Sequence, residues 1–304
     1  GGVLIGIIQA LTKIDVTNTI LQYLYYATPF IVVIVALLKH SKHLVKQSST
    51  KKLSVSKFRI IEVKPKITRS SVVKMAICGA LAVSAPYIFS SYWTRVITMG
   101  YVFAIAILSL VVLTGILGKI SFAQAAFMGV GGYTYALLST HYGWTAFPSI
   151  VAALGLTIVF SLLIAIPSLK FKGLFLAIVT FTFQVMLDNT LFIDNWFAGG
   201  FVGRKVSKPA LLFIDLSNRM HLYFFVLILA ALAFIFVRNL PFTKIGRDFR
   251  AVRDSEDAAK SLGVNVWKTK IIGFAVSAAM AGAAGIIYAI ANGSIVGGQG
   301  YNMG

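Results

Sequence analysis

The residues best suited to binding a partner lie in a polar stretch between Pro241 and Gly263, which apolar segments flank on both sides. Its first half mixes bases and acids. Its second half, Asp257–Gly263, is rich in helix-forming residues and ends at a glycine, as helices often do. The charged residues that precede Asp257 in this stretch are Lys244, Arg247, Asp248, Arg250, Arg253, Asp254 and Glu256. A polar helix held between two membrane spans suits a docking site for a soluble protein. We therefore predict a contact surface here rather than a catalytic centre.

A second group of residues could line a path for a solute. Ser121 could cap the start of a helix, whose free N–H groups attract carboxylates. Gln124 is one of the few polar side chains in an apolar stretch, where it could line a path or serve as a packing amide with satisfied hydrogen bonds. The glycines that follow permit close backbone approach or a broken helix, as in transporters. They are Gly129, Gly131 and Gly132, and together these five residues are the candidates for a translocation path.

Catalytic and metal-binding patterns are absent from the sequence. There is no Gly-Lys-Ser/Thr loop for a phosphate, and the one cysteine, Cys78, lies in an apolar span. Acidic residues are nearly absent from the apolar segments, although Asp188 lies near the end of one. A proton-coupled transporter needs buried carboxylates, so this driving force is disfavoured. The sequence thus predicts a protein that is not an enzyme and that binds no metal or cofactor itself.

The elements that must position these residues are membrane helices. Hydrophobic residues make up 58% of the 304 residues and charged residues 12%, and the mean hydropathy is +0.85. Apolar runs of about 18 residues recur, which is the length needed to cross a hydrocarbon core. We expect an all-α polytopic transmembrane bundle of about eight spans, with a broken or re-entrant Gly-rich segment. The expected apolar segments are 1–12, 20–38, 73–90, 95–117, 121–140, 147–169, 174–191, 221–237 and 271–290.

Positive charge predicts the orientation of these spans. The formal net charge is +19, and 22 of the 28 Lys and Arg residues fall on one side when the spans alternate. Cytoplasmic loops carry an excess of Lys and Arg, so this side, which includes the 241–263 stretch, is predicted to be cytoplasmic. Membrane topology therefore explains the charge, and nucleic acid is not an expected partner. Residues 39–74 are predicted to form a solvated basic linker, with contact to lipid headgroups as the alternative.

The 241–263 stretch resembles the cytoplasmic coupling loop of ABC-importer permeases. The pattern of that family is Glu-Ala-Ala, three residues, then Gly, and here Asp257–Gly263 matches it with Asp in place of Glu. The preceding Gly246–Arg253 and the following Val264–Val266 are similar to the branched-chain amino-acid form of the loop. The resemblance implies a coupling helix that an ATPase grips. Its residues would be Gly246, Arg247, Arg250, Arg253, Glu256, Asp257, Ala258, Ala259 and Gly263.

Three further stretches extend the resemblance over Trp93 to Ser294. Residues 118–133 are similar to the family's Gly-Gln-Leu-Ser-Leu-Gly-His-Ala-Ala-Phe, with Lys119, Ala123 and Gln124 in place of Gln, Gly and His. Residues 169–178 are similar to its Leu-Arg-Gly-Leu-Tyr-Leu-Ala-Ile turn, and residues 199–200 fit its outer Gly-Gly. Residues 1–38 resemble the end of the sister permease. The chain is thus expected to divide into the C-terminal end of a preceding permease unit (1–38), a basic cytoplasmic linker (39–74) and a C-terminally truncated permease domain (75–304).

The resemblance implies a permease subunit of an ABC importer for branched-chain or other small amino acids, in the inner (plasma) membrane of the cell. The implied partners are ATPase subunits that bind ATP and Mg²⁺, a sister permease, an extracytoplasmic solute-binding protein and membrane lipid. Residues 297–301 are similar to related permeases for sugars or nucleosides, which are the alternative substrates. An ion-coupled secondary transporter is the alternative from another class.

Overall fold

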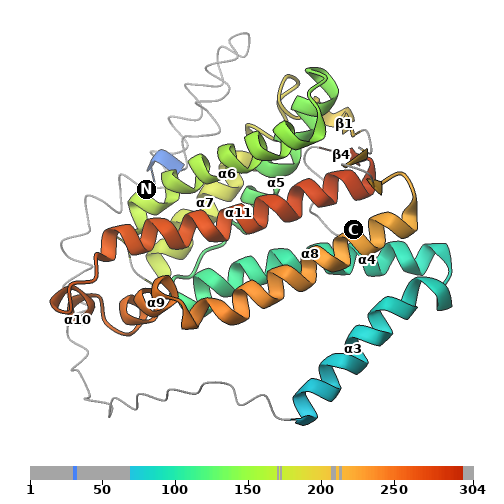
Figure 1. Ribbon diagram of the computed structural model, residues 1–304. Helices are drawn as coiled ribbons and strands as arrows, with labels where there is room; N and C mark the ends of the chain where they lie inside the picture. Colours follow the sequence, from blue (N-terminus) through green and yellow to red (C-terminus); the bar gives the residue numbers. More distant parts are fainter. Residues whose placement is uncertain are drawn as a thin grey trace, which may run out of the picture.

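The computed structural model describes residues 30–32, 69–169, 171, 173–206, 210–211 and 214–296, and these residues fold almost entirely as helices (Figure 1). In chain order the longer helices are α3 (Arg69–Ile88), α4 (Ser91–Leu110), α5 (Gln124–Ala136), α6 (Ala146–Ser168), α7 (Leu174–Asn189), α8 (Arg219–Asn239) and α11 (Val266–Asn292). Two short helices, α9 (Lys244–Asp254) and α10 (Glu256–Ser261), join α8 to α11. The all-α class expected from the sequence is therefore confirmed.

Within the described residues, four helices are long and apolar enough to cross a membrane. They are Ser91–Ile116, Ala146–Ser168, Arg219–Phe242 and Val266–Asn292. The first consists of α4 and the π-helical η1 (Val111–Ile116), and the third consists of α8 and the 3-10 turn η4 (Leu240–Phe242). Gly79–Ile88 and Leu174–Asn189 are shorter apolar helices. Ile107, Leu163 and Ile228 are exposed on these helices, which suits contact with lipid. The chain is a multi-pass membrane protein.

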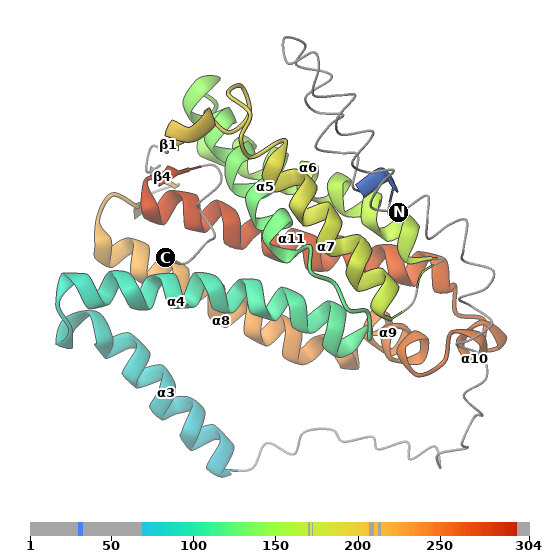
Figure 2. The same ribbon diagram turned by 180° about the vertical axis from the view of Figure 1, so that it is seen from behind.

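Helix α11 lies at the centre of the bundle and packs along α4, α5 and α6 (Figures 1 and 2). Its packed face consists of small buried residues such as Ala278, Ala281 and Gly282. Small side chains let membrane helices approach closely, which explains why this helix occupies the centre. Helix α8 packs beside α4, and α3 diverges from the bundle (Figure 2).

The Gly-rich stretch differs from the broken helix expected from the sequence. Helix α5 runs through Gly129, Gly131 and Gly132 without interruption and continues as a π-helical turn, η2 (Leu137–His141). The helical chain is instead interrupted ahead of α5, where Gly118 adopts a left-handed φ of 71°. A Cβ on Gly118 would lie 2.6 Å from Arg253 Cγ, so α9 packs directly against this interruption. The glycines of α5 permit close helix packing, and a re-entrant character of this segment stays a prediction.

The loop between α7 and α8 folds back onto the end of α11. A 3-10 turn, η3 (Gly200–Val202), leads into β1 (Arg204–Lys205), which pairs antiparallel with β4 (Ser294–Ile295). A second pair joins β2 (Ala210–Leu211) to β3 (Ile214–Asp215). The β1–β4 pair and the α9–α10 segment lie at opposite ends of the bundle (Figure 1). Of the expected divisions, 1–38 and 39–74 lie outside the described residues apart from 30–32 and 69–74.

Candidate functional site

The α9–α10 segment is built from two helices that begin at side-chain caps. Thr243 Oγ1 accepts the Gly246 N–H at 3.1 Å at the start of α9, and Ser255 Oγ accepts the Ala258 N–H at 3.3 Å at the start of α10. Such caps satisfy N–H groups that a helix start leaves without partners. The first turn of α10 is acidic, which also suits the positive end of a helix dipole. The polar stretch is therefore an ordered pair of helices joined at Ser255.

A small apolar core holds this pair against the rest of the bundle. Phe249 and Val252 of α9 and Ala259 of α10 are buried, as expected for the inner face of an amphipathic element. Gly246 is buried as well, and a Cβ there would lie 1.8 Å from the Leu240 carbonyl oxygen. Within the predicted coupling set, Gly246 and Ala259 therefore pack the segment rather than present it to a partner.

The arginines of α9 hold the segment in place by donating to backbone carbonyl groups. Arg247 Nη1 and Arg250 Nη2 donate to carbonyl oxygens of the η4 turn at 3.0 and 2.5 Å. Arg253 Nη1 donates to the Gly115 carbonyl of η1 at 2.5 Å. Charge-assisted hydrogen bonds of this kind are stronger than neutral ones. The sequence predicted these arginines as part of a partner surface, and the structure gives their guanidinium groups partners within the chain.

An ion cluster joins α10 to three other elements. Glu256 Oε1 lies 2.5 Å from Lys119 Nζ and 3.0 Å from Lys270 Nζ, and Lys270 Nζ also donates to the Ser168 carbonyl at 3.2 Å. These side chains are only 10%, 8% and 1% exposed, respectively, and ions so shielded persist when they are paired. We call Lys119, Glu256 and Lys270 the ionic latch. It connects α10 to the segment ahead of α5, to the first turn of α11 and to the end of α6.

Sequence reasoning missed the role of Lys119 and of Lys270. Lys119 is separated from Glu256 by 137 residues, and in the sequence it was only a departure from the family's Gln. One signal in the sequence could have pointed to the cluster. Lys119 and Lys270 each border an apolar span on the side where the 241–263 stretch is predicted to lie. Within the described residues, no three His, Cys, Asp or Glu side chains gather closely enough to hold a metal ion. The two Nζ–Oε1 contacts make the cluster a set of ion pairs.

The latch determines the charge state of Glu256. Burial raises the pKa of a carboxyl group, but the hydrogen bonds and charges of Lys119 and Lys270 outweigh burial and hold the pKa of Glu256 at about 2, below its usual 4.5. Glu256 is consequently ionised throughout the neutral and mildly acidic range.

We expect the latch to stop stabilising the fold only in strongly acidic solution. The folded-state pKa is depressed, so the contribution of Glu256 is complete above the unfolded-state value of 4.5 and is lost as the pH falls toward about 2. Thermal unfolding of wild type and Glu256→Gln in detergent checks this. The difference between their midpoints should stay constant from neutral pH to about pH 5 and then shrink. A difference that persists undiminished near pH 2 would contradict the latch.

The side of α10 that faces away from the bundle is exposed. The Asp257 side chain is 88% exposed and Leu262 is 80% exposed, and Ala258 and Gly263 lie beside them on the surface. We call these four residues the coupling face. Further large apolar side chains exposed on the same end are Phe242, Ile245 and Trp267. Exposed apolar side chains on a polar element are typical of a protein-binding surface. Sequence reasoning missed Leu262, because a single leucine in a helix-forming run carries no sign of exposure.

Gln124 lies in a hydrogen-bonded network between three helices. Its Oε1 accepts from Ser109 Oγ of α4 and its Nε2 donates to Ser277 Oγ of α11, both at 3.0 Å. Ser277 Oγ in turn donates to the Ser109 carbonyl at 2.8 Å. This geometry matches the packing-amide alternative, and a role for Gln124 in lining a path stays a prediction.

Ser121 lies just ahead of α5 in a buried position. Its Oγ accepts the Ala123 N–H at 3.3 Å, so it caps the turn that precedes the helix, and α5 itself begins one residue later. The adjacent Phe122 N–H donates to Thr180 Oγ1 of α7 at 3.0 Å. The segment that carries Lys119 of the latch is therefore anchored to α7 as well.

The glycines of α5 lie in close contacts with other elements. Cβ atoms added to Gly131 and Gly132 would lie 2.5 and 2.9 Å from the carbonyl oxygens of Gly282 and Gly285 in α11. A Cβ on Gly129 would lie 2.3 Å from an aromatic ring of the α7–α8 loop. Of the predicted path residues, Gln124, Gly131 and Gly132 contact α11, Gly129 contacts the α7–α8 loop, and Ser121 lies ahead of α5.

Known proteins similar to this chain are transport permeases. The chain is 28% identical over 279 residues to the high-affinity branched-chain amino acid transport system permease protein LivM of Salmonella typhimurium, a match that covers 82% of the chain and 64% of the relative. The Escherichia coli protein of the same name is 28% identical over 276 residues, with the same coverage. The probable branched-chain amino acid transport permease protein LivM of Methanocaldococcus jannaschii is 29% identical over 147 residues, covering 47% of the chain and 41% of the relative. The chain spans 64% of the length of the first two relatives, and no solved structure matches it.

The family comparison covers the same elements as the site. Residues 92–301 match the family described as branched-chain amino acid transport system / permease component. This range contains the coupling face, the ionic latch and the Gln124 network, and it agrees with the resemblance expected over Trp93–Ser294. Because the match extends over more than half of the chain, this protein belongs to the family of branched-chain amino acid transport system permease components.

Proposed function

We propose that this chain is the membrane-spanning permease subunit of an ATP-binding-cassette importer for branched-chain or other small amino acids. The observation that carries the proposal is the α9–α10 segment, which has the exposed coupling face on one side and the ionic latch on the other. A helix through which a motor protein moves a bundle must be rigid and must be joined to the helices that move. The helix caps and the small apolar core make the segment rigid, and the ionic latch connects it to the helices of the bundle.

In this proposal, movement of the ATPase reaches the bundle through Glu256 and Arg253. ATP binding closes the ATPase subunits and displaces α10. Glu256 draws Lys119 and Lys270 with it, while Arg253 acts on the end of η1. Since Lys119 precedes α5 and Lys270 lies near the start of α11, both helices of the central contact receive the displacement together. Their shift relative to α4 and α6 would open the pathway alternately to the two sides of the membrane.

The proposal includes partners and an orientation. Separate ATPase subunits would bind ATP and Mg²⁺, and this chain would bind no cofactor. A sister permease would supply the other half of the pathway, and an extracytoplasmic solute-binding protein would deliver the solute. The concentration of Lys and Arg at the α9–α10 end supports a cytoplasmic location for that end in the inner (plasma) membrane. Counting the four long helices, α3, α7 and the apolar segments 1–12 and 20–38, the proposed bundle has about eight spans, with α5 as an additional re-entrant element.

Replacing Leu262 with Glu should abolish binding of the ATPase while the permease stays folded. Leu262 is 80% exposed, so the change removes little packing within the chain, but it places a charge in the apolar part of the coupling face. Residues at the centre of such interfaces contribute about 2 kcal/mol or more, so the amount of ATPase that co-purifies with tagged permease should fall at least about tenfold.

Val202→Glu is the matched control for this experiment. Val202 is 90% exposed and lies two residues before β1, which is at the opposite end of the bundle in Figure 1, so the same chemical change there should leave ATPase binding unaltered. Normal co-purification and normal amino-acid uptake with Leu262→Glu would show that the coupling face is assigned wrongly.

A further inference from the structure

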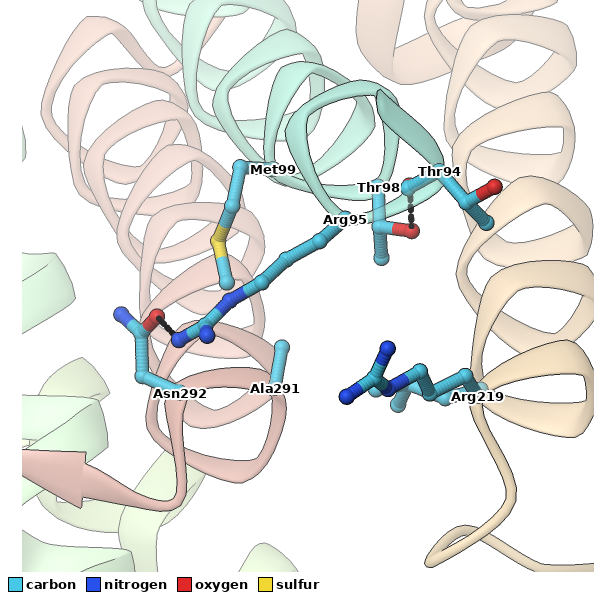
Figure 3. A pocket seen from close by; sticks show the side chains of 8 residues that line it. Thr94, Arg95, Thr98, Met99, Arg219, Ala291 and Asn292 are labelled. Carbon is cyan, nitrogen blue, oxygen red and sulfur yellow. Dashed lines mark hydrogen bonds between the residues drawn. The ribbon is translucent and has the colours of Figure 1, made fainter. Parts of the chain in front are cut away.

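A pocket lies at the end of the bundle opposite the α9–α10 segment, and the mechanism proposed above does not use it (Figure 3). It has a volume of about 110 Å³ and is formed by the first turns of α4 and α8 and the last turn of α11. The residues that line it are Thr94, Arg95, Thr98, Met99, Arg219, Leu222, Ala291 and Asn292. Figure 3 shows the side chains of Arg95 and Arg219 extending from different helices into the space between them.

The charges of the pocket favour an anion. Its lining contains two guanidinium groups and no acidic side chain. Arg219 is the first residue of α8, and Arg95 lies in the first turns of α4, so the positive ends of two helix dipoles add to the same region. In the described part of the chain, the Arg219 guanidinium has no hydrogen-bond or ion-pair partner. Both arginines are exposed, so a ligand can reach them.

The neighbours of the two arginines further define the ligand. Arg95 Nη2 donates to Asn292 Oδ1 at a long 3.3 Å, which orients the guanidinium group and leaves most of its N–H groups for a ligand. The hydroxyl groups of Thr94 and Thr98 donate to carbonyl oxygens of their own helix, at 3.1 and 2.7 Å. The remaining wall consists of the apolar side chains Met99, Leu222 and Ala291.

This combination fits a carboxylate that is attached to a short aliphatic group. A guanidinium group presents a planar set of N–H donors that matches a carboxylate, and the apolar wall accommodates the carbon chain beside it. A free inorganic anion would use the arginines and leave the wall without a function. The amide of Asn292 offers a polar group of the kind that an ammonium group needs.

We propose that Arg95 and Arg219 bind the carboxylate of the aliphatic amino acid that enters the permease. This inference rests on the proposed function and assigns the residues that hold the solute at the outer end. Asn292 is the last residue of α11 and Lys270 of the ionic latch lies near its start, so one helix of 27 residues, about 40 Å long, joins the pocket to the latch. A solute in the pocket therefore contacts the same element that the ATPase displaces.

An anionic lipid is the other source of an oxyanion at this place. Tyr92 and Trp93 are exposed at the start of α4, and such residues gather where a helix leaves the membrane. A lipid phosphate is joined through ester oxygens to polar glycerol and headgroup atoms, whereas the carboxylate of the solute is joined to a short aliphatic side chain that suits the apolar wall, and for this reason the solute is the favoured occupant. The experiment below separates the two sources.

The test measures binding of radiolabelled leucine to the purified full chain in nanodiscs made of phosphatidylcholine alone. Arg95→Gln and Arg219→Gln should each weaken leucine binding at least about tenfold, since each removes one charge-assisted contact. Leucinamide, which lacks the carboxylate, should not compete with leucine. Arg219→Lys, which keeps the charge but not the planar fork, should recover part of the affinity. Lys205→Gln removes an exposed positive charge from the same end outside the pocket and should change nothing.

Thermal unfolding midpoints equal to wild type would show that the glutamine variants are folded. Unchanged leucine binding in both folded variants would overturn the inference, and effective competition by leucinamide would do the same. Loss of a co-purifying anionic lipid from the variants, without a change in leucine binding, would assign the pocket to lipid and also overturn it. ATP-driven leucine uptake by the wild-type importer in proteoliposomes is measured in parallel. Absence of uptake there refutes the proposed function, whereas uptake that both arginine variants retain refutes the inference alone.

Discussion

Under the proposed function, Glu256→Gln should leave the permease able to bind an ATPase but unable to convert ATP hydrolysis into transport. The amide keeps the shape of the side chain and removes the charge that pairs with Lys119 and Lys270. Two shielded ammonium groups then lose this counter-ion, and breaking such a buried pair costs about 3–5 kcal/mol. We expect α10 to lose its ionic connection to α11. The number of amino acids moved per ATP hydrolysed in proteoliposomes should therefore fall at least about tenfold.

The matched control for this variant is Asp254→Asn. It makes the same chemical change two residues away, at the exposed C-terminal end of α9. An exposed carboxylate contributes little to stability, so both transport and ATPase activity should stay within about twofold of wild type. Equal losses in the two variants would mean that the total charge of the segment matters and that the latch does not.

A double variant tests whether the latch residues act as a unit. Lys119→Gln restores the residue of the family pattern and removes one of the two ammonium groups that Glu256 neutralises. The double variant should have a higher thermal unfolding midpoint than Glu256→Gln alone, because fewer charges remain unpaired. Strictly additive effects would argue against a direct interaction of Lys119 with Glu256.

A single methyl group at Gly285 is expected to have the second large effect. In Gly285→Ala the new Cβ would lie 1.9 Å from the Met128 carbonyl oxygen, which belongs to the backbone of α5. A side chain could rotate away, but a helix backbone can yield only if α5 separates from α11. Overpacking of this kind costs about 1–3 kcal/mol or more. We therefore expect the thermal unfolding midpoint in detergent to fall by about 2–6 °C.

Gly155→Ala serves as the comparison for Gly285→Ala. Gly155 also lies inside a helix, α6, but it is exposed and an added Cβ would meet nothing within 4 Å. Alanine is a better helix former than glycine by about 0.5–1 kcal/mol, so the midpoint should stay unchanged or rise slightly. A similar loss of stability in both variants would show that the close α5–α11 contact is not the cause of the loss.

The long membrane helices could be predicted from the sequence. The expected segments 221–237 and 271–290 fall within helices long and apolar enough to cross a membrane, and 95–117 and 147–169 run only one residue past the ends of two others. Length and hydropathy are properties of a continuous run of residues, so no knowledge of neighbours is needed. The glycines of α5 were harder to interpret, because a glycine permits both a break and a close contact, and only the position of α11 decides between them.

The position of the coupling segment could also be predicted, but its two sides could not. Glu256 and Asp257 are adjacent acids in the same polar run, yet Glu256 is held between two lysines and Asp257 faces outward. Consecutive residues of a helix point in directions about 100° apart, so a short polar helix always presents different residues to the bundle and to its surroundings. Which residue faces which side depends on where the helix is anchored.

The sequence by itself determined that this protein is a bundle of membrane helices with a polar helical segment between its last two long spans, because hydrophobic run length and helix-forming composition are local properties. Tertiary structure alone decided which distant residues meet: Lys119 with Glu256, Gly131 with Gly282, and Arg95 with Arg219 across one pocket. Lipid-facing helices all offer similar apolar surfaces, so their order in the bundle is set by a few small residues and ion pairs that act only once the helices are side by side.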